Sequence, residues 1–176
     1  MIQFSKQKNT GFTLVETLIA ISIFSVSIIA MMSVLGGGIS NTNYAKKKMT
    51  ASYLAQEGIE YIRNMRDNYV LYPVNGTWNS FKSQLAPCNS GSECGFSTTN
   101  PIVISKCTSN PNVCKIYLDN GNYNTNSIGN DSGFTRKIWA TTVSSDEIKI
   151  YSAVSWTQGS GSFNITFSEN LFNWVE

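Results

Sequence analysis

One carboxylate, Glu16, stands just inside a long apolar stretch, where a charge is costly. At that depth in a membrane a carboxylate costs ~2.5–3.5 kcal/mol on insertion scales and normally needs a partner. No Lys or Arg occurs between Phe12 and Ala45, so the charge has no cationic side chain in its own segment. Cleavage after Gly11 would create a cation, the new α-amine of Phe12, four residues away. We therefore expect Glu16 of one chain to pair with the Phe12 amine of a neighbouring chain.

The apolar segment itself, residues 17–39, is long enough to cross a membrane. It contains 23 residues without a charge, whereas a helix needs about 20 to span a bilayer core. A removable secretory signal usually has an apolar region of only ~7–15 residues. No clear A-x-A cleavage pattern follows the segment, which favours a retained helix over an ordinary signal peptide. A plain membrane anchor remains an alternative.

A single helix is predicted to continue beyond the apolar segment, from about Thr13 to Arg66. Gly36–Gly38 is its weak point, because each glycine costs roughly 1 kcal/mol of helix stability. Arg63 can meet Glu60 and Asp67 on the helix surface, at spacings of three and four. Helical spacing also places a set of small and apolar residues on one face, where they would contact a folded head: Ala51, Ala55, Gly58, Ile62 and Met65.

After Asn68 the composition changes to Gly, Asn, Ser, Thr, Pro and aromatic residues, which is typical of short strands and turns. The sequence therefore predicts an α+β protein, with the long N-terminal helix packed on a small antiparallel β-sheet head. The predicted division is a leader at 1–11, an assembly helix at 12–68 and a head at 69–176. The expected strands are Ile102–Ser105, Cys114–Leu118, Phe134–Val143, Glu147–Trp156 and Ser162–Ser168.

The last two of these strands alternate apolar and polar residues and should pair as a hairpin. The turn between them is expected at Gln158–Gly161, which holds two glycines. By contrast, Asp119–Gly133 is predicted to be a long polar loop. Asp119–Asn122 could offer oxygen ligands to calcium, but the stretch lacks the spaced carboxylates and final Glu of an EF-hand loop. Turn chemistry explains these residues better.

Four cysteines, all in the second half of the chain, indicate disulfides in an oxidising compartment. A zinc site is the alternative, but the spacings C-x5-C and C-x6-C differ from the tight knuckles that tetrahedral zinc usually uses. Four cysteines allow three connectivities. Closeness in sequence favours Cys88 with Cys94 and Cys107 with Cys114.

The composition also excludes several functions. The chain has no histidine, so His-based acid–base chemistry, Ser-His-Asp triads and His-ligated metals are excluded. We expect no enzyme activity and no cofactor. Without residues 1–11, which hold Lys6 and Lys8, the chain has 11 basic and 11 acidic residues. A neutral body argues against nucleic acid as a partner, because phosphate binding needs clustered Lys and Arg.

The stretch from Gly11 reads GFTLVETLIAI. Together with the basic leader before it, this stretch resembles the processing and methylation motif of type IV prepilins and type II secretion pseudopilins. The resemblance extends from Lys6 to about Asn68. Within this range, the stretch Ala55–Glu60 (AQEGIE) is similar to minor pilins. Less specifically, the C-terminal sheet of minor pilins is resembled by Phe134–Arg136, by Trp156 and by the closing Leu171–Trp174 (LFNW). Major subunits of this family often carry a proline in the helix, whereas this chain has three glycines there, which favours a minor subunit or pseudopilin.

The resemblance implies a structural role. It implies that a prepilin peptidase cuts after Gly11 and methylates Phe12, and that Glu16, fifth in the mature chain, is the assembly carboxylate. The expected partners are other pilin subunits, the peptidase, an inner-membrane assembly platform and, before assembly, membrane lipid. The expected precursor is a single-pass protein of the cytoplasmic membrane with its head outside, and the mature form is part of a filament. The leading interpretation is a minor pilin; a secretion pseudopilin, a DNA-uptake pilin or a membrane-anchored adhesin are alternatives.

Overall fold

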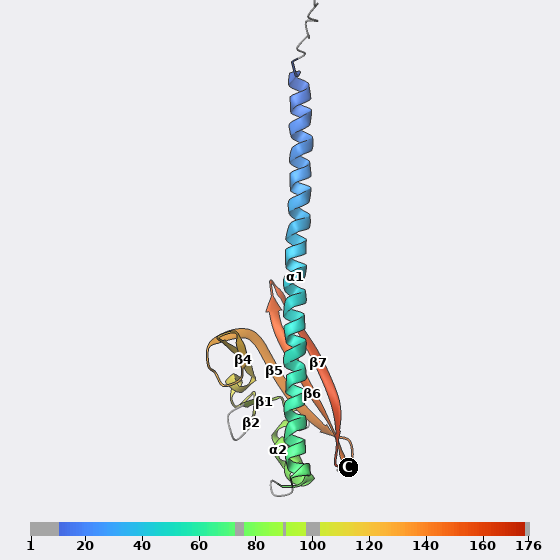
Figure 1. The fold of residues 1–176 in the computed structure, drawn as a ribbon, viewed down its shortest axis with the longest axis vertical. Coiled ribbons are helices and arrows are strands. Elements are labelled where there is room, and N and C mark those ends of the chain that lie inside the picture. The colour runs from blue at the N-terminus through green and yellow to red at the C-terminus, as the bar shows by residue number, and fades with distance from the viewer. Residues whose placement is uncertain (1–10, 73–75, 90, 98–102, 175–176) are drawn as a thin grey trace, which may run out of the picture. The chain divides into compact units, whose positions relative to one another are not determined.

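The structure is a computed structural model that describes residues 11–72, 76–89, 91–97 and 103–174 (Figure 1). The leader lysines Lys6 and Lys8, and Ile102 of the first expected strand, lie outside the described residues. The chain divides into two units, Met1–Asn43 and Tyr44–Glu176. Its elements are α1 (Leu14–Leu71), α2 (Trp78–Leu85), 3-10 helices at Ala86–Cys88 and Pro111–Cys114, β1 (Cys94–Ser97), β2 (Val103–Lys106), β3 (Lys115–Asp119), β4 (Asn122–Asn124), β5 (Asn130–Thr142), β6 (Glu147–Gln158) and β7 (Gly161–Phe172).

Helix α1 begins one residue after the predicted start at Thr13 and ends five residues beyond the predicted end at Arg66. It has 58 residues and contains no proline, which is the residue that most strongly breaks a helix. The helix is continuous across Gly36–Gly38, so the expected weak point does not interrupt it. From Tyr44 onward α1 belongs to the head. Its buried face contains the five residues that the spacing predicted, together with Leu54 and Ile59: Ala51, Leu54, Ala55, Gly58, Ile59, Ile62 and Met65.

The head is an α+β fold in which the C-terminal part of α1 packs on an antiparallel sheet of seven strands (Figure 1). β5 is central. One of its edges pairs with β6, which in turn pairs with β7, and its other edge pairs with β3 and, at Ile138, with β1. β2 continues from β1, and β4 continues from β3. The long strands β5 to β7 therefore form the platform for the helix, while the short strands extend the sheet on the far side of β5.

The hairpin of β6 and β7 is the expected one, although β7 continues past Ser168 to Phe172. Gln158 pairs with Gly161, which leaves Gly159 and Ser160 as a two-residue turn. Gly159 has a φ of 58°. A positive φ at the first central position is the mark of a type II′ turn, which fits the twist of a two-residue hairpin.

The prediction of a long polar loop at Asp119–Gly133 was wrong at both ends. β4 and the start of β5 lie within it. Asn120 and Gly121 have φ values of 48° and 83°, and Asp119 pairs with Asn122 across them. This is the type I′ turn that Asn-Gly favours, because both of its central residues need positive φ. The Asn-Gly pair was thus a hairpin signal.

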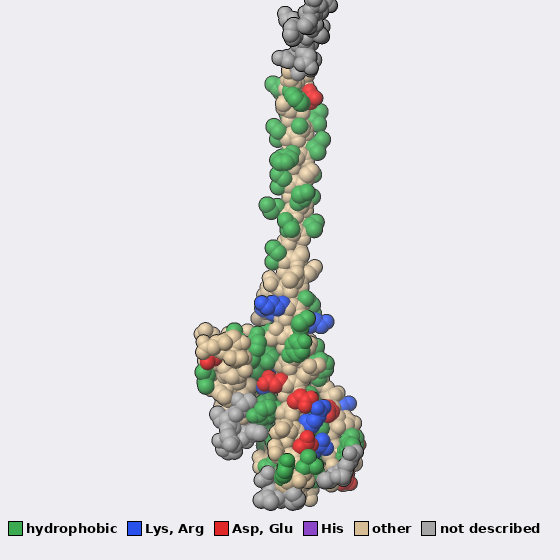
Figure 2. All heavy atoms as spheres, in the orientation of Figure 1, with side chains coloured by type: hydrophobic (Ala, Val, Ile, Leu, Met, Phe, Trp, Pro, Cys, Tyr) green, Lys and Arg blue, Asp and Glu red, His purple; other side chains and the backbone are tan. Residues whose placement is uncertain are grey.

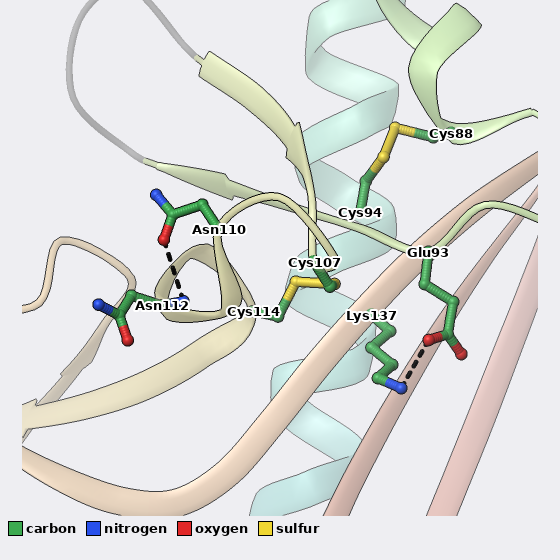
Figure 3. The surroundings of a disulfide bond; sticks show 8 residues. All are labelled: Cys88, Glu93, Cys94, Cys107, Asn110, Asn112, Cys114 and Lys137. Atoms are coloured by element: carbon green, nitrogen blue, oxygen red, sulfur yellow. Dashed lines mark hydrogen bonds and ion pairs between the residues drawn. A yellow bond between two sulfur atoms is a disulfide. The ribbon is translucent and has the colours of Figure 1, made fainter.

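Two further short elements, α2 and β1, were not predicted. The Cys88–Cys94 disulfide lies in the stretch between the end of α2 and the start of β1. In α2 the buried residues are Trp78, Phe81 and Leu85, a helical spacing in only eight residues. The disulfides are Cys88–Cys94, with Cα atoms 5.5 Å apart, and Cys107–Cys114, with Cα atoms 5.7 Å apart (Figure 3). The pairing is the one that closeness in sequence favoured, and it places all four sulfur atoms in disulfides. Cys114 closes a 3-10 helix rather than opening β3.

Helix and sheet approach each other closely at Gly58. A Cβ atom at this position would lie 2.5 Å from Ser152 Oγ and 3.1 Å from Arg136 Cδ. Gly58 therefore lies over Arg136 and Ser152, the two buried polar residues of the inner sheet face. These two residues separate two groups of buried apolar side chains. One group includes Ile59, Ile62, Met65, Phe81, Phe96 and Ile150, and the other includes Ala51, Leu54, Ala55, Phe134, Val154 and Trp156.

We expect Gly58→Ala to destabilise the head although alanine favours helix. Overpacking a close contact typically costs ~1–3 kcal/mol, against a gain of roughly 1 kcal/mol in helix propensity. Unfolding of the full chain in detergent, followed by tryptophan fluorescence, would measure the effect. Gly37→Ala is the matched control, because its Cβ would meet no atom within 4 Å. Equal stability of the two variants would contradict the close approach.

Candidate processing and assembly site

The segment around Gly11 and Phe12 precedes the first helical residue. Thr13 caps α1: its side-chain oxygen accepts a hydrogen bond of 3.3 Å from the Glu16 backbone N–H. Its carbonyl accepts the first helical bond, 3.2 Å from the Thr17 N–H. Ser or Thr followed three residues later by Glu is the pattern of a capping box, and the structure shows its first half. The Gly11–Phe12 peptide therefore lies outside the helix, and Phe12 is 77% exposed.

Glu16 lies in the first turn of α1 and is exposed. The N-terminal end of a helix carries a partial positive charge, which favours a carboxylate there. A partial charge does not replace a counterion, and residues 11–45 contain no Lys or Arg. The described part of this segment thus offers Glu16 no cationic side chain, as the sequence analysis indicated.

Four hydroxyls of the segment form hydrogen bonds within the helix. The hydroxyls of Ser22, Ser25 and Ser27 each donate a hydrogen bond of 2.8 Å to a backbone carbonyl, at Ile19, Ile21 and Ile23. The Thr17 hydroxyl donates to Leu14 in the same way, at 2.9 Å. Hydroxyls bonded in this manner need no hydrogen bond from water. Polar groups in lipid must find their partners within the protein in this way.

Apolar side chains surround this part of α1 on all sides rather than forming one stripe. In Figure 2 they run along the visible face of the segment. Among the described residues, α1 is the helix that is long and apolar enough to cross a membrane. A helix that is apolar all round is buried in lipid or in a larger assembly. The exposed large apolar residues include Leu14, Leu18, Ile21, Phe24, Ile28, Met31, Leu35 and Ile39.

Within the head, a buried arginine, Arg136, connects the sheet to α1. It is 3% exposed. Its guanidinium donates to the Leu54 carbonyl at 3.0 Å and to the Glu57 carboxylate at 2.7 Å. It also lies 4.4 Å from the ring centre of Phe96. The sequence placed Arg136 in a stretch that resembles the family's C-terminal sheet but did not predict its burial, although the other buried residues of β5 are apolar.

Burial and pairing act on Arg136 in opposite directions. Removal from water lowers the pKa of its guanidinium, and the neighbouring Glu57 carboxylate opposes that effect. Burial also raises the pKa of Tyr61, with a smaller contribution in the same direction from Glu57. Tyr61 stacks on Phe96 with ring centres 4.3 Å apart. Arg136, Phe96 and Tyr61 therefore form one stack that joins β5, β1 and α1.

The remaining charges of this helix face are also paired, but not all as predicted. Arg63 pairs with Glu60, as expected, and with Glu169 of β7. The hydrogen bond to Glu169 is the main reason that the pKa of Arg63 is raised. Asp67 pairs with Arg66 rather than with Arg63.

The calcium hypothesis gains no support from the Asp119–Gly133 stretch. Asn124 Oδ1 accepts hydrogen bonds from the backbone N–H groups of Asn126 and Ile128. Asp131 accepts from the Gly133 N–H at 2.8 Å and pairs with Lys115 at 3.2 Å. These two contacts lower the pKa of Asp131. The described residues hold no cluster of three potential metal ligands of the His, Cys, Asp and Glu types.

Comparison with known families agrees with the geometry of the N-terminal segment. Residues 6–32 match the family described as the prokaryotic N-terminal methylation motif. No curated protein and no solved structure matches the chain. The motif and the apolar helix define a pilin-like structural subunit and fit a membrane-anchored precursor. Together with the α+β head, the motif at residues 6–32 supports the superfamily of type IV pilins and pseudopilins.

We expect Glu57→Ala to destabilise the head by ~2–3 kcal/mol, because it leaves a buried guanidinium with a single carbonyl as partner. Loss of one partner from a fully buried pair costs ~3–5 kcal/mol, and the half-exposed position of Glu57 reduces this. Adding Arg136→Met should recover most of the loss, since an apolar side chain can replace a buried pair. Denaturant unfolding of the single and double variants would measure both effects.

Glu60→Ala is the control for this experiment. Its carboxylate lies one turn further along α1, but it pairs with Arg63, whose side chain is 37% exposed. Exposed pairs contribute ~1 kcal/mol or less. If Glu60→Ala proved as damaging as Glu57→Ala, the burial of Arg136 would not be the cause.

Proposed function

We propose that this chain is a minor pilin, a structural and non-enzymatic subunit of a type IV pilus-like filament. The observation that carries the proposal is Glu16: a carboxylate at the capped start of the long apolar segment of α1, without a cation in that segment. Such a charge is stable in an apolar assembly only if another chain supplies the cation. The α-amine of a processed Phe12 has the required charge and lies at the same level of the chain.

In this proposal the leader 1–11 is removed by a prepilin peptidase, and Phe12 is then methylated. Residues 12–68 form the assembly helix, which crosses the membrane at about 17–39 before it enters the filament. Residues 69–176 form a head on the outer side, where oxidising conditions maintain both disulfides. The partners are other pilin subunits, the peptidase and the assembly platform of the inner membrane.

A minor pilin is favoured over the other members of the superfamily by the resemblance of AQEGIE and by the three helix glycines. A secretion pseudopilin and a DNA-uptake pilin share the same N-terminal chemistry and are the alternatives. A basic surface on the head would favour DNA uptake, but the basic and acidic residues outside the leader are balanced. A membrane-anchored adhesin would use the helix as an anchor only and would not need Glu16.

Processing has a direct test. We expect the mature chain isolated from its host to begin at Phe12 and to carry one extra methyl group on its α-amine. Mass spectrometry of the N-terminal peptide would show both. Replacement of Gly11 by a bulky residue should leave the leader attached, whereas Lys6→Gln should not move the site of cleavage. A cut beyond Ile39, or a leader retained in the host, would contradict the proposal.

Assembly depends on Glu16 in the second test. Glu16→Ala and Glu16→Gln should leave membrane insertion, processing and head folding intact, because each removes a charge from an apolar segment. Both should strongly reduce incorporation into filaments, because the Phe12 amine then lacks its counterion, a loss of ~3–5 kcal/mol in an apolar environment. The measurement is the ratio of filament-associated to membrane-retained subunit.

Thr13→Ala separates the charge from the helix cap. It removes the hydrogen bond to the Glu16 N–H, a typical cost of ~1 kcal/mol, but keeps the carboxylate. Its incorporation should stay near that of the wild type. Wild-type incorporation of Glu16→Gln would show that the charge is not needed and would favour the plain anchor.

A further inference from the structure

An open hollow lies at one end of the head, where β7 ends beside the turn between β5 and β6. It has a volume of about 390 Å³ and is lined by Asp146, Phe172, Asn173 and Trp174. Small-molecule sites in proteins have volumes of about 300–1,000 Å³, so the hollow is large enough for one ligand unit. We propose that it binds an uncharged sugar, the terminal pyranose of a glycan whose ring substituents are mainly equatorial.

The hollow is at the end of the head that lies farthest along α1 from the point where the chain enters. The chain enters the head at Tyr44, whose ring lies 5.0 Å, centre to centre, from the ring of Phe163 near the start of β7. At the other end of β7, the Phe172 carbonyl accepts a hydrogen bond of 2.8 Å from Arg66, near the end of α1 (Figure 1). All four lining residues are exposed to solvent, so the hollow is open to a ligand.

Two aromatic side chains form the apolar walls of the hollow. Trp174 is 56% exposed and Phe172 is 39% exposed. Their ring centres are 6.3 Å apart and the ring planes make an angle of 70°, so the two rings form a corner rather than one flat surface. The C–H groups of a pyranose with equatorial substituents form a flat apolar face. Such a face stacks on one aromatic ring while the edge of the sugar contacts the other ring.

A carboxylate and an amide at the same place can bind the hydroxyl groups of the sugar. Asn173 Nδ2 donates a hydrogen bond of 2.9 Å to Asp146 Oδ1, and Ser145 Oγ donates one of 2.7 Å to Asp146 Oδ2. These two contacts lower the pKa of Asp146, so its carboxylate is ionised at neutral pH and only accepts hydrogen bonds. Each carboxylate oxygen has a second lone pair for a sugar hydroxyl, and the Asn173 amide has a second N–H and an oxygen.

Bonds to α2 and to the segment that follows β7 hold these polar groups in place. Trp78 Nε1 of α2 donates to the Ser145 carbonyl at 2.8 Å. The Asn173 N–H donates to the Asp146 carbonyl at 2.9 Å, so the end of β7 is attached to the turn between β5 and β6. The next residue, Trp174, is thus held beside Asp146 although its side chain is exposed. A site that is formed before the ligand arrives has less to lose in ordering on binding.

An uncharged sugar fits these groups better than a cation does, although a carboxylate beside aromatic rings can also bind an organic ammonium group. Asp146 already accepts hydrogen bonds from two neutral donors. The Lys82 ammonium, which donates to the Ser145 carbonyl at 3.1 Å, adds a positive charge that acts on Asp146. Lys82 would repel a bound cation, whereas sugar hydroxyls would only add donors. An acidic sugar would in turn meet the negative charge of Asp146.

Titration of the full chain with cellotetraose and with chitotetraose tests the site, because both are uncharged chains of pyranoses with equatorial substituents. The chain is kept in a polyoxyethylene detergent, which carries neither a sugar nor an ammonium group, and binding is measured by calorimetry. We expect at least one of the two sugars to bind with a Kd of about 1 mM or tighter. Trp174→Ala should weaken this binding at least about tenfold. Its thermal unfolding should match that of the wild type, because the Trp174 ring is exposed.

Two matched controls separate the hollow from general effects of substitution. Tyr53→Ala removes an exposed aromatic ring from α1, and Asp131→Asn removes an exposed carboxylate that also accepts a backbone hydrogen bond. Neither should change the Kd. Asp146→Asn keeps the shape of the side chain but removes its charge and one acceptor oxygen, so it should weaken sugar binding about tenfold.

Sugar binding that Trp174→Ala leaves unchanged would overturn the proposal and place the site elsewhere. Failure of both sugars to bind would overturn it as well, and two further measurements would then identify the occupant. Binding of tetramethylammonium would assign the hollow to an organic cation, and dimers that Trp174→Ala dissociates would assign it to a second copy. The hollow belongs to the head alone, so none of these results depends on processing at Gly11 or on Glu16.

Discussion

The contact of α1 with the inner face of the sheet at Gly58 organises the whole head. Gly58 allows the helix to approach so closely that Arg136 is covered, and Arg136 in turn bonds Leu54 and Glu57 on the same helix. Apolar packing on both sides of this point then follows from the register of β5 and β6, which places their inward residues beneath successive turns of α1. A buried ion pair contributes little net stability, but its geometry fixes which turn of the helix lies over which residue of the sheet.

The sequence was most informative where periodicity was long. The alternation in β6 and β7 and the helical spacing from Ala51 to Met65 predicted the observed elements, because each pattern is repeated over several turns or pairs. Short elements carry too few repeats for this. α2 shows its apolar spacing only once, and β4 has three residues. The hairpin that joins β3 and β4 depends on the backbone preferences of Asn120-Gly121, a signal of turn type rather than of hydrophobic pattern.

The N-terminal motif was readable because its chemistry is local. Gly11, Phe12 and Glu16 lie within six residues, and their meaning comes from the absence of any cation near a carboxylate in an apolar segment. The role of Arg136 was not accessible in this way. Its partner Glu57 is 79 residues away in the sequence, and only the folded structure shows that the two meet. An arginine in the inward phase of β5 could be recognised from the pattern, but its partner could not.

The carboxylates of α1 then separate into two kinds. Glu57, Glu60 and Asp67 each pair with an arginine of the same chain, at Arg136, Arg63 and Arg66. Glu16 has no such partner in its segment, although this segment is the more apolar one and the cost of an unpaired charge is higher there. Three serine hydroxyls of the same segment, at Ser22, Ser25 and Ser27, bond helix carbonyls and so do not need water. An apolar segment whose hydroxyls at Thr17, Ser22, Ser25 and Ser27 bond its own carbonyls, but which offers Glu16 no cationic side chain, is suited to a state in which a second chain provides the missing cation.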